Sequence, residues 1–217
     1  MKLFIDFDST FTKVEALDKL AQIALSENKE KDQIIKKIID ITNLGMEGKM
    51  NFSESLKSRL ELLNFSKNHL DILIEELKKE ISDSIILEKD FFIENSPDIY
   101  IISGGFKEFI YPVVKDFGIL EDHVLANEFI FNGDQVVGFD QDNFLAHDLG
   151  KVKQIQSLGL DGEKIMVGDG WTDYQVKEEG VVDYFIAYIE NIKRENVINK
   201  ANFVANNWRE IINYLNK

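Results

Sequence analysis

Two aspartates separated by one residue, Asp6 and Asp8, are the first groups in this chain whose spacing suggests chemistry. They end an apolar run that starts at Leu3, and residues 4–7 are predicted to form a buried strand of a parallel sheet. If the strand continued, both carboxylates would point the same way, because alternate side chains share a face. Two such close carboxylates repel each other and therefore favour a bound cation. The alternative is an ordinary Asx or Ser turn after a strand.

Composition limits the partners of this chain. Its 217 residues are 44% hydrophobic, enough for one domain with a large insertion or for two small domains. The 25 basic and 39 acidic residues leave a net charge of -14, which argues against nucleic-acid or anionic-membrane partners. Without cysteine there are no thiolate metal sites, so Mg²⁺ is the expected cation. No signal peptide precedes the first strand and no apolar run approaches the roughly 20 residues of a membrane span, which predicts a soluble, cytoplasmic protein.

The remaining periodicity predicts a doubly wound, mainly parallel α/β fold that is interrupted by a helical block. The first helix is expected to begin near Lys13, behind a capping box formed by Thr12 and Glu15. The other predicted elements are strands over 99–102, 164–167 and 184–187, helices over 67–79, 109–113, 151–158 and 190–199, and a hairpin over 129–139. The expected domains are an α/β core formed by 1–12 and 81–217 and an all-helical insertion, the cap, formed by 13–80.

Three further groups follow later predicted strands. Residues 103–105, Ser-Gly-Gly, combine a hydroxyl with unhindered N–H groups before a helix, which suits a phosphate, although a glycine pair can simply form a tight turn. Lys151 begins a predicted helix, where a lysine opposes the helix dipole and favours an anionic partner; Lys153 and a solvated surface role are the alternatives. Asp169 and Asp173 offer two more carboxylates in a glycine-rich turn, or a turn with an N-cap.

In this order the motifs resemble those of the haloacid dehalogenase superfamily of phosphatases. The matching strings are Asp6-Phe7-Asp8-Ser9-Thr10, Ser103-Gly104-Gly105-Phe106, a lysine, and Gly168-Asp169-Gly170 with Asp173. The resemblance covers essentially the whole chain. The first string, the position of the helical insertion and the second string are most similar to those of the phosphoserine phosphatases. The stretch from Met46 to Phe52, with Arg59, is similar to the cap segment that closes over the substrate serine in that family.

This resemblance implies a Rossmann-like core with a helical cap and the hydrolysis of O-phosphoserine, in serine biosynthesis, by a monomer or homodimer. Asp6 would be the nucleophile that forms an aspartyl-phosphate, and Asp8 would be the general acid and base. Mg²⁺ would be held by Asp6, the backbone carbonyl of Asp8, and Asp169, with Asp173 in support. The residues implied for phosphate binding are Ser9, Ser103, Gly104, Gly105 and Lys151. Those implied for substrate binding are Glu15, Met46, Phe52, Arg59 and Thr172.

Arg59 has an independent interpretation from helical spacing. It falls on the same face as the apolar stripe formed by Phe52, Leu56, Leu60 and Leu63. A guanidinium there is suited to bind a carboxylate with two hydrogen bonds, as a substrate serine would require, or it extends past the apolar face and pairs within the cap. For the glutamate at position 15, the alternatives are the capping box and, by the resemblance, the substrate amino group.

Three positions depart from the family pattern, and several functions stay open. Leu149 precedes Gly150 where the family has a lysine, so that role passes to Lys151 or Lys153. Thr172 stands where many relatives have asparagine, and Trp171 is bulkier than the usual residue, which leaves the substrate open. The alternatives are a phosphatase or phosphotransferase for phosphohomoserine, phosphoethanolamine or a methionine-salvage enol phosphate, a receiver-type signalling module, and a non-catalytic phospholigand-binding protein.

Overall fold

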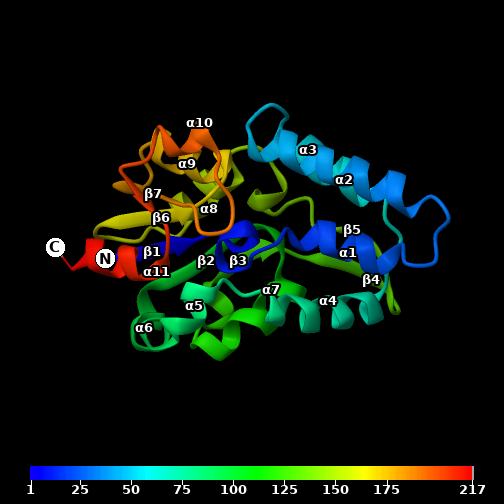
Figure 1. Cartoon of the computed structure of the whole chain (residues 1–217), viewed down its shortest axis with the longest axis horizontal. Coiled ribbons are helices and arrows are strands. Elements are labelled where there is room, and N and C mark those ends of the chain that lie inside the picture. The colour runs from blue at the N-terminus through cyan, green and yellow to red at the C-terminus, as the bar shows by residue number, and fades with distance from the viewer. Residues whose placement is uncertain (217) are drawn as a thin grey trace.

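The computed structural model describes residues 1–216 and is built around a six-stranded sheet with the strand order β3-β2-β1-β6-β7-β8 (Figure 1). Every neighbouring pair in this sheet is parallel. Its strands are β1 (Lys2–Ile5), β2 (Ile99–Phe106), β3 (Val124–Asn127), β6 (Lys164–Gly168), β7 (Tyr184–Tyr188) and β8 (Phe203–Ala205). The chain moves outward from β1 in both directions, so the carboxyl end of β1 is a topological switch point, where such sheets bind ligands.

The central strand β1 is buried on both faces, which explains its continuous apolar run. Leu3 and Ile5 pack into the core on one side of the sheet, whereas Phe4 packs into the core on the other side. The ring of Phe4 stacks on Tyr100 of β2 at 5.2 Å between centroids. Because both faces need apolar partners, helices cover both sides of the sheet.

One layer of helices includes α8, α9 and α10, and a second includes α5, α6, α7 and α11 (Figure 1). Their bounds are α5 (Asp83–Leu87), α6 (Lys89–Asn95), α7 (Lys107–Val114), α8 (Gly150–Ser157), α9 (Trp171–Glu178), α10 (Glu195–Ile198) and α11 (Trp208–Leu215). In α11 the fully buried ring of Trp208 stacks on Phe92 at 4.8 Å. The predicted doubly wound α/β class is confirmed.

The segment between β1 and β2 is helical, as the periodicity predicts, and contains no strand of either sheet among residues 13–80. Its first four helices are α1 (Ala16–Ala24), α2 (Lys31–Met46), α3 (Phe52–Leu60) and α4 (Lys67–Lys79). Figure 1 shows α2 and α3 on one side of α1, and α4 on the other side next to α7. The division into a core of 1–12 and 81–217 and a cap of 13–80 stays a prediction. Of the predicted cap, α2 and α3 lie on the opposite side of α1 from α4 and carry Met46, Phe52 and Arg59. The hairpin forms from β4 (Phe129–Asn132) and β5 (Gln135–Phe139).

Several local predictions are wrong at their boundaries. β1 ends at Ile5, before both aspartates, and α1 begins at Ala16 without a capping box. The Thr12 hydroxyl donates instead to the carbonyls of Phe7 and Val14, so local pattern yields to the geometry of this loop. The helix expected over 190–199 is confined to α10, and the sequence did not predict the strands β3 and β8 or the helices α5 and α6. Among residues 1–216 no helix is long and apolar enough to cross a membrane.

Candidate active site

The loop after β1 places the two leading aspartates. The Asp6 N–H donates to the Val167 carbonyl at 2.9 Å, which continues the β1–β6 pairing by one residue. Residues 7–11 then form a wide helical turn in which Ser9 adopts a left-handed φ of 56°. Phe7 and Phe11 are fully buried and stack at 6.2 Å, so they anchor this loop in the core. The aspartates are thus held by a turn and not, as the spacing suggests, by strand alternation.

Asp6, Asp169 and Asp173 meet at this sheet edge, each offering one carboxylate oxygen within 4.8 Å of the others. All three are buried. Lys151, at the start of α8, places its Nζ 2.7 Å from Asp6 Oδ1 and 2.5 Å from Asp173 Oδ1. The exposed Lys153 lies outside this cluster, so the structure places Lys151 in it. The negative charge of these buried carboxylates exceeds the positive charge beside them. Their oxygens therefore form a donor set that fits a hard divalent cation such as Mg²⁺.

The charges in this cluster are strongly coupled. Burial raises the pKa of Asp173 to about 7, and repulsion from Asp6 adds to the effect against the attraction of Lys151. Burial opposes the charged form of Lys151, but attraction from Asp173 and Asp6 outweighs it and raises the pKa of this ammonium group. Excess negative charge on the carboxylates is therefore stabilised by protons or by a cation.

Asp8 points away from this cluster. Its Oδ1 accepts the Ala16 N–H at 2.7 Å, at the N-terminus of α1. Burial, together with repulsion from Glu15 and Asp6, raises the pKa of Asp8 well above its usual range, although the Ala16 hydrogen bond opposes this. The side chain is therefore suited to carry a proton. The resemblance implies that Asp8 would contact a metal through its backbone carbonyl and not through this side chain.

The Ser103–Gly105 segment lies within β2, which continues to Phe106, and α7 begins only at Lys107, so the glycines do not open the helix as expected. The Gly105 N–H donates to Ser103 Oγ at 2.9 Å, which orients that hydroxyl. A Cβ on Gly104 would lie 2.2 Å from the ring of Phe52. The ring of Phe52 therefore rests directly on the glycine, and a larger residue at this position would have to displace it.

A cavity that is open to solvent, with about 350 Å³ of empty space, lies between the core and the cap, and predicted residues form nearly all of its lining. Leu17 of α1 is the one lining residue that the sequence analysis does not name. The predicted residues at its wall are Asp6, Asp8, Glu15, Met46, Phe52, Arg59, Ser103, Gly104, Gly105, Lys151 and Thr172. Three predicted residues, Ser9, Asp169 and Asp173, are not part of its lining.

Arg59 reaches this cavity from α3 with only 5% of its surface exposed. Its guanidinium donates to the Ser55 carbonyl at 3.2 Å and to Thr42 Oγ1 at 3.3 Å. Within residues 1–216, no carboxylate lies within ion-pair distance of it. Burial lowers the pKa of Arg59, and attraction from Glu15, Asp18 and Asp8 opposes the shift. This buried guanidinium lines the cavity and is available to pair with an anion there.

Glu15 precedes α1 but its carboxylate does not cap the helix. Its Oε1 accepts the Ser9 hydroxyl at 2.7 Å, which explains why Ser9 supports the site without lining the cavity. Burial raises the pKa of Glu15 against the attraction of Arg194. The cavity wall thus presents one negative group, the Glu15 carboxylate, and one positive group, the Arg59 guanidinium.

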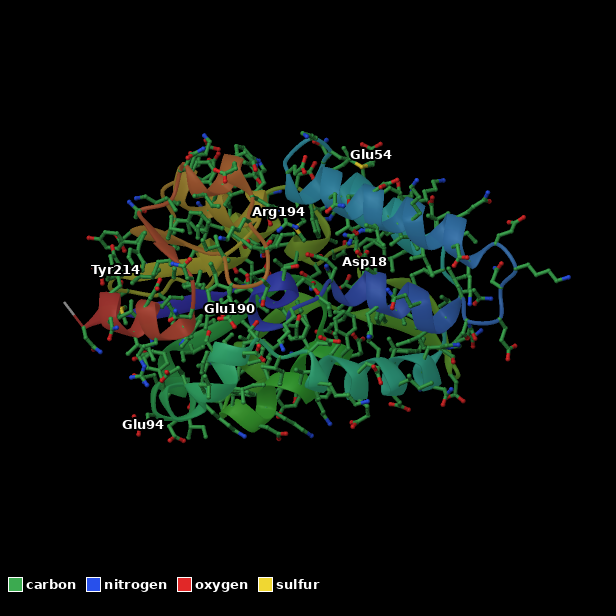
Figure 2. All side chains as sticks on the ribbon, in the orientation of Figure 1. Asp18, Glu54, Glu94, Glu190, Arg194 and Tyr214 are labelled. Carbon is green, nitrogen blue, oxygen red and sulfur yellow. The ribbon has the colours of Figure 1, made fainter. Side chains whose placement is uncertain are left out.

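The sequence analysis missed the loop between β7 and α10. Arg194, the last residue of that loop and labelled in Figure 2, pairs with Asp169, and its Nη2 lies 3.9 Å from Glu15 Oε1. Asn191 donates to the carbonyls of Ser9 and Thr12, which fixes the Asp8 loop. Neither residue belongs to a recognisable motif. The only available signal was that this loop follows a parallel strand at the same sheet edge.

Comparison with known proteins places these features in context. The profile of a family described as haloacid dehalogenase-like hydrolase matches residues 3–178. The chain is 30% identical to the chloroplastic phosphoserine phosphatase of Arabidopsis thaliana, over 97% of this chain and 70% of that protein. It is also 30% identical to the phosphoserine phosphatase of Homo sapiens, over 97% and 91% of the two chains.

Solved structures agree with this. A phosphoserine phosphohydrolase-like protein from Francisella tularensis subsp. tularensis SCHU S4 superimposes with a TM-score of 0.88, at 33% identity and over 99% of each chain. A substrate-bound phosphoserine phosphatase shares the fold, with a TM-score of 0.77 at 23% identity over 98% and 97% of the chains.

Proposed function

Because this chain belongs to the haloacid dehalogenase-like hydrolase family, we propose that it is a Mg²⁺-dependent phosphatase that hydrolyses O-phospho-L-serine to serine and phosphate. The observation that supports phosphoserine as the substrate is the arrangement of charged groups around the cavity. Arg59 is available to a carboxylate, Glu15 to an ammonium group, and Lys151 with Ser103 to a phosphate. Phosphoserine carries all three of these groups on one small molecule.

In the first half of the reaction, a carboxylate oxygen of Asp6 attacks phosphorus and forms an aspartyl-phosphate, while the bond from phosphorus to the serine oxygen breaks. Asp8 gives its proton to that leaving oxygen. The raised pKa of Asp8 supports this role, because the group must be protonated at the start. General acid catalysis of this kind contributes about 10²- to 10⁴-fold.

In the second half, the Asp8 carboxylate takes a proton from water as the water oxygen attacks phosphorus. The bond between phosphorus and the Asp6 oxygen breaks, which restores Asp6 and releases phosphate. Asp8 is protonated again at the end, so the two residues return to their starting states. The Ala16 N–H holds the Asp8 carboxylate in place between the two steps.

The metal site would be formed by Asp6, Asp169 and Asp173, together with the backbone carbonyl of Asp8. When bound, Mg²⁺ would supply the positive charge that lets a phosphate dianion approach these carboxylates. Arg194, paired with Asp169, is placed to orient that ligand. Ca²⁺ is a less suitable occupant because it takes up to eight oxygen ligands, whereas Mg²⁺ keeps several water ligands and needs only a few from the protein.

The phosphoryl oxygens would be bound by Ser103 Oγ, the Gly104 N–H and the Lys151 ammonium, with Gly105 and Ser9 in support. Met46 and Phe52 would close over the substrate from the cap, and Thr172 would line the cavity from α9. A contact between cap and core backs this closure, since Asp148 accepts the Ser53 N–H at 3.0 Å and its hydroxyl at 3.1 Å. Closure excludes bulk water from the reacting groups.

Other small monoesters remain the alternative substrates. Phosphohomoserine shares all three charged groups, phosphoethanolamine lacks the carboxylate that Arg59 would bind, and a methionine-salvage enol phosphate lacks both the carboxylate and the ammonium group. The names of the relatives favour an enzyme over a receiver module or a non-catalytic binding protein. A role in serine biosynthesis, a cytoplasmic location and a monomeric or dimeric state stay predictions.

The test is phosphate release from phosphoserine, phosphohomoserine, phosphoethanolamine and an aryl phosphate, with Mg²⁺ or with EDTA. We expect phosphoserine to have the highest kcat/KM by at least about tenfold, the discrimination that a few buried polar contacts provide, and EDTA to abolish release. Equal rates with all four esters would support the phosphatase activity but refute phosphoserine as the specific substrate. No release from any ester in Mg²⁺ would refute the proposed function.

A further inference from the structure

Asn127, the last residue of β3, is a buried polar side chain that none of the motifs includes. It has 0% exposed surface. Its Nδ2 donates to two backbone carbonyls, that of Gly104 at 3.0 Å and that of Leu145 at 3.1 Å. Within residues 1–216, its Oδ1 has no hydrogen-bond partner. One amide group thus connects two segments that lie 41 residues apart in sequence.

The first segment holds one side of the proposed phosphate site. The Gly104 carbonyl belongs to the residue whose N–H we assign to the phosphate, between Ser103 and Gly105. A hydrogen bond to this carbonyl restricts rotation of the backbone on both sides of it. Asn127 therefore acts on the direction of the N–H group and on the Ser103 hydroxyl through the chain that joins them.

The second segment holds the other side. A Cβ on Gly150 would lie 2.4 Å from the Phe144 carbonyl oxygen and 2.8 Å from Leu145 Cα, so the two backbones are in direct contact. Leu149 turns into α8 with a left-handed φ of 57°, and Lys151 follows one residue after this contact. The position of Leu145 therefore sets where α8 begins and where the Lys151 ammonium lies.

We propose that Asn127 is a positioning residue that fixes the distance between the Ser103–Gly105 segment and Lys151, the two halves of the phosphate site. The proposal rests on the phosphatase function proposed above and deepens it. The residue does not reach the cavity itself and acts only through the two carbonyls that it binds. Catalysis depends on such spacing, because a displacement of about 1 Å can reduce a rate about 10²-fold.

A purely structural role explains the contacts less well. Asn143 already attaches the same segment to β3, because its Nδ2 donates to the Ala126 carbonyl and its Oδ1 accepts the Leu145 N–H, both at 2.9 Å. What Asn127 adds is the link to Gly104. The fully buried Oδ1 of Asn127 without a partner is destabilising, so stability alone does not explain this amide, whereas its N–H groups contact both halves of the site.

The test compares Asn127→Leu and Asn127→Asp, which have nearly the same shape but lose the paired donors, with Asn143→Ala as the matched control. Each variant is checked for folding by circular dichroism and thermal unfolding. The measurements are kcat and KM for phosphoserine, inhibition by orthovanadate, which mimics the phosphoryl transition state, and the Kd of inorganic phosphate by calorimetry. All are made on the full chain in saturating Mg²⁺.

For both Asn127 variants we expect kcat to fall by about 10- to 100-fold, vanadate inhibition to weaken by a similar factor, and KM to change less than about threefold. Asn143→Ala should keep kcat and vanadate affinity within about threefold of the wild type. Normal kcat and vanadate affinity in a folded Asn127 variant would overturn the proposal. So would equal losses in the Asn143 variant, or failure of both Asn127 variants to fold, because each outcome indicates a structural role.

These results separate the two proposals. If the wild-type protein hydrolyses phosphoserine and the Asn127 variants behave normally, only the positioning role fails. If the wild-type protein hydrolyses no ester but binds inorganic phosphate, the proposed function fails, and weaker phosphate binding by the Asn127 variants than by Asn143→Ala still supports the positioning role. Unchanged phosphate binding in that case refutes it.

Discussion

Lys151 in the strand-end cluster around Asp6 and Arg59 on the cap face are both buried cations, yet their partners differ. Lys151 is 7% exposed and contacts two carboxylates, at 2.7 and 2.5 Å. Arg59 is 5% exposed, and among residues 1–216 its hydrogen-bond partners are a carbonyl and a hydroxyl. Buried charges are normally paired, so the cap side is incomplete as it stands. In the core, Lys151 is already paired with carboxylates of the protein. On the cap, the charge of Arg59 is left for a ligand to pair with.

The surroundings of the two cations explain this contrast. The cluster at the sheet edge holds more negative than positive charge, so attraction outweighs burial and the pKa of Lys151 rises. On the cap, burial outweighs the more distant carboxylates and the pKa of Arg59 falls. Substrate binding should therefore change the environment of Arg59 much more than that of Lys151.

The sharpest test of the core is Asp6→Asn, which removes the nucleophile and leaves the shape of the site unchanged. We expect phosphate release to fall by about 10⁴-fold or more, because no covalent intermediate can form. Steady-state phosphate release and chemical trapping of the aspartyl-phosphate would measure this. Retention of more than about 1% of wild-type activity would assign the nucleophile to another residue.

Lys151→Met tests whether the core cation is required, and Lys153→Met, on the same helix but exposed, is its matched control. We expect Lys151→Met to lose about 10²- to 10³-fold in kcat/KM, the usual effect of removing one group that stabilises transition-state charge. The metal-free variant should also unfold at a lower temperature, because Asp6 and Asp173 lose their shared partner. Equal, small effects of both substitutions would contradict the contrast with the cap.

Arg59→Ala tests the cap side. We expect kcat/KM for phosphoserine to fall by about 10²-fold, as for the loss of one partner from a buried charged pair, and kcat/KM for phosphoethanolamine to change by less than about threefold. Phosphoethanolamine is the control because it offers this guanidinium no carboxylate. Parallel losses with both esters would show that Arg59 stabilises the cap and does not select the substrate.

The same two regions differ in how much the sequence could predict. Asp6, Asp169 and Lys151 were predictable because each follows a strand or begins a helix, and parallel strands bring such positions to one edge. The helix face on which Arg59 lies was predictable, because helical spacing is regular. The lack of a carboxylate partner for Arg59 was not, since that depends on how α3 packs against α1 and α2.

Arg194 and Asn127 show where the sequence argument ends. Each is a single polar residue outside any periodic pattern, and each acquires its contacts from the order of strands in the sheet. The capping box predicted for Thr12 and Glu15 failed for the converse reason. Its spacing was correct, but Ser9 and the carbonyls of the preceding loop offered those side chains better partners.

The smallest expected effect concerns the cluster's need for a cation. Burial and repulsion from Asp6 raise the pKa of Asp173 to about 7, above its value in an unfolded chain. The metal-free fold therefore favours protonated Asp173, and the stability that this contributes is present at acidic pH and lost as the pH rises towards 7. Mg²⁺ needs the ionised form, so its binding strengthens over the same range.

Consequently, the same Mg²⁺ concentration should stabilise the protein more at neutral to alkaline than at acidic pH. At about 100 times its Kd near pH 8, Mg²⁺ contributes about 2.7 kcal/mol, which raises Tm by about 5–10 °C. Near pH 5.5, competition from the proton on Asp173 weakens binding about 30-fold and leaves a rise of about 2–3 °C. Thermal unfolding with Mg²⁺ and with EDTA measures the difference. An equal rise at both pH values, or the same pH dependence in Asp173→Asn, would mean that this carboxylate does not carry the proton that the cation displaces.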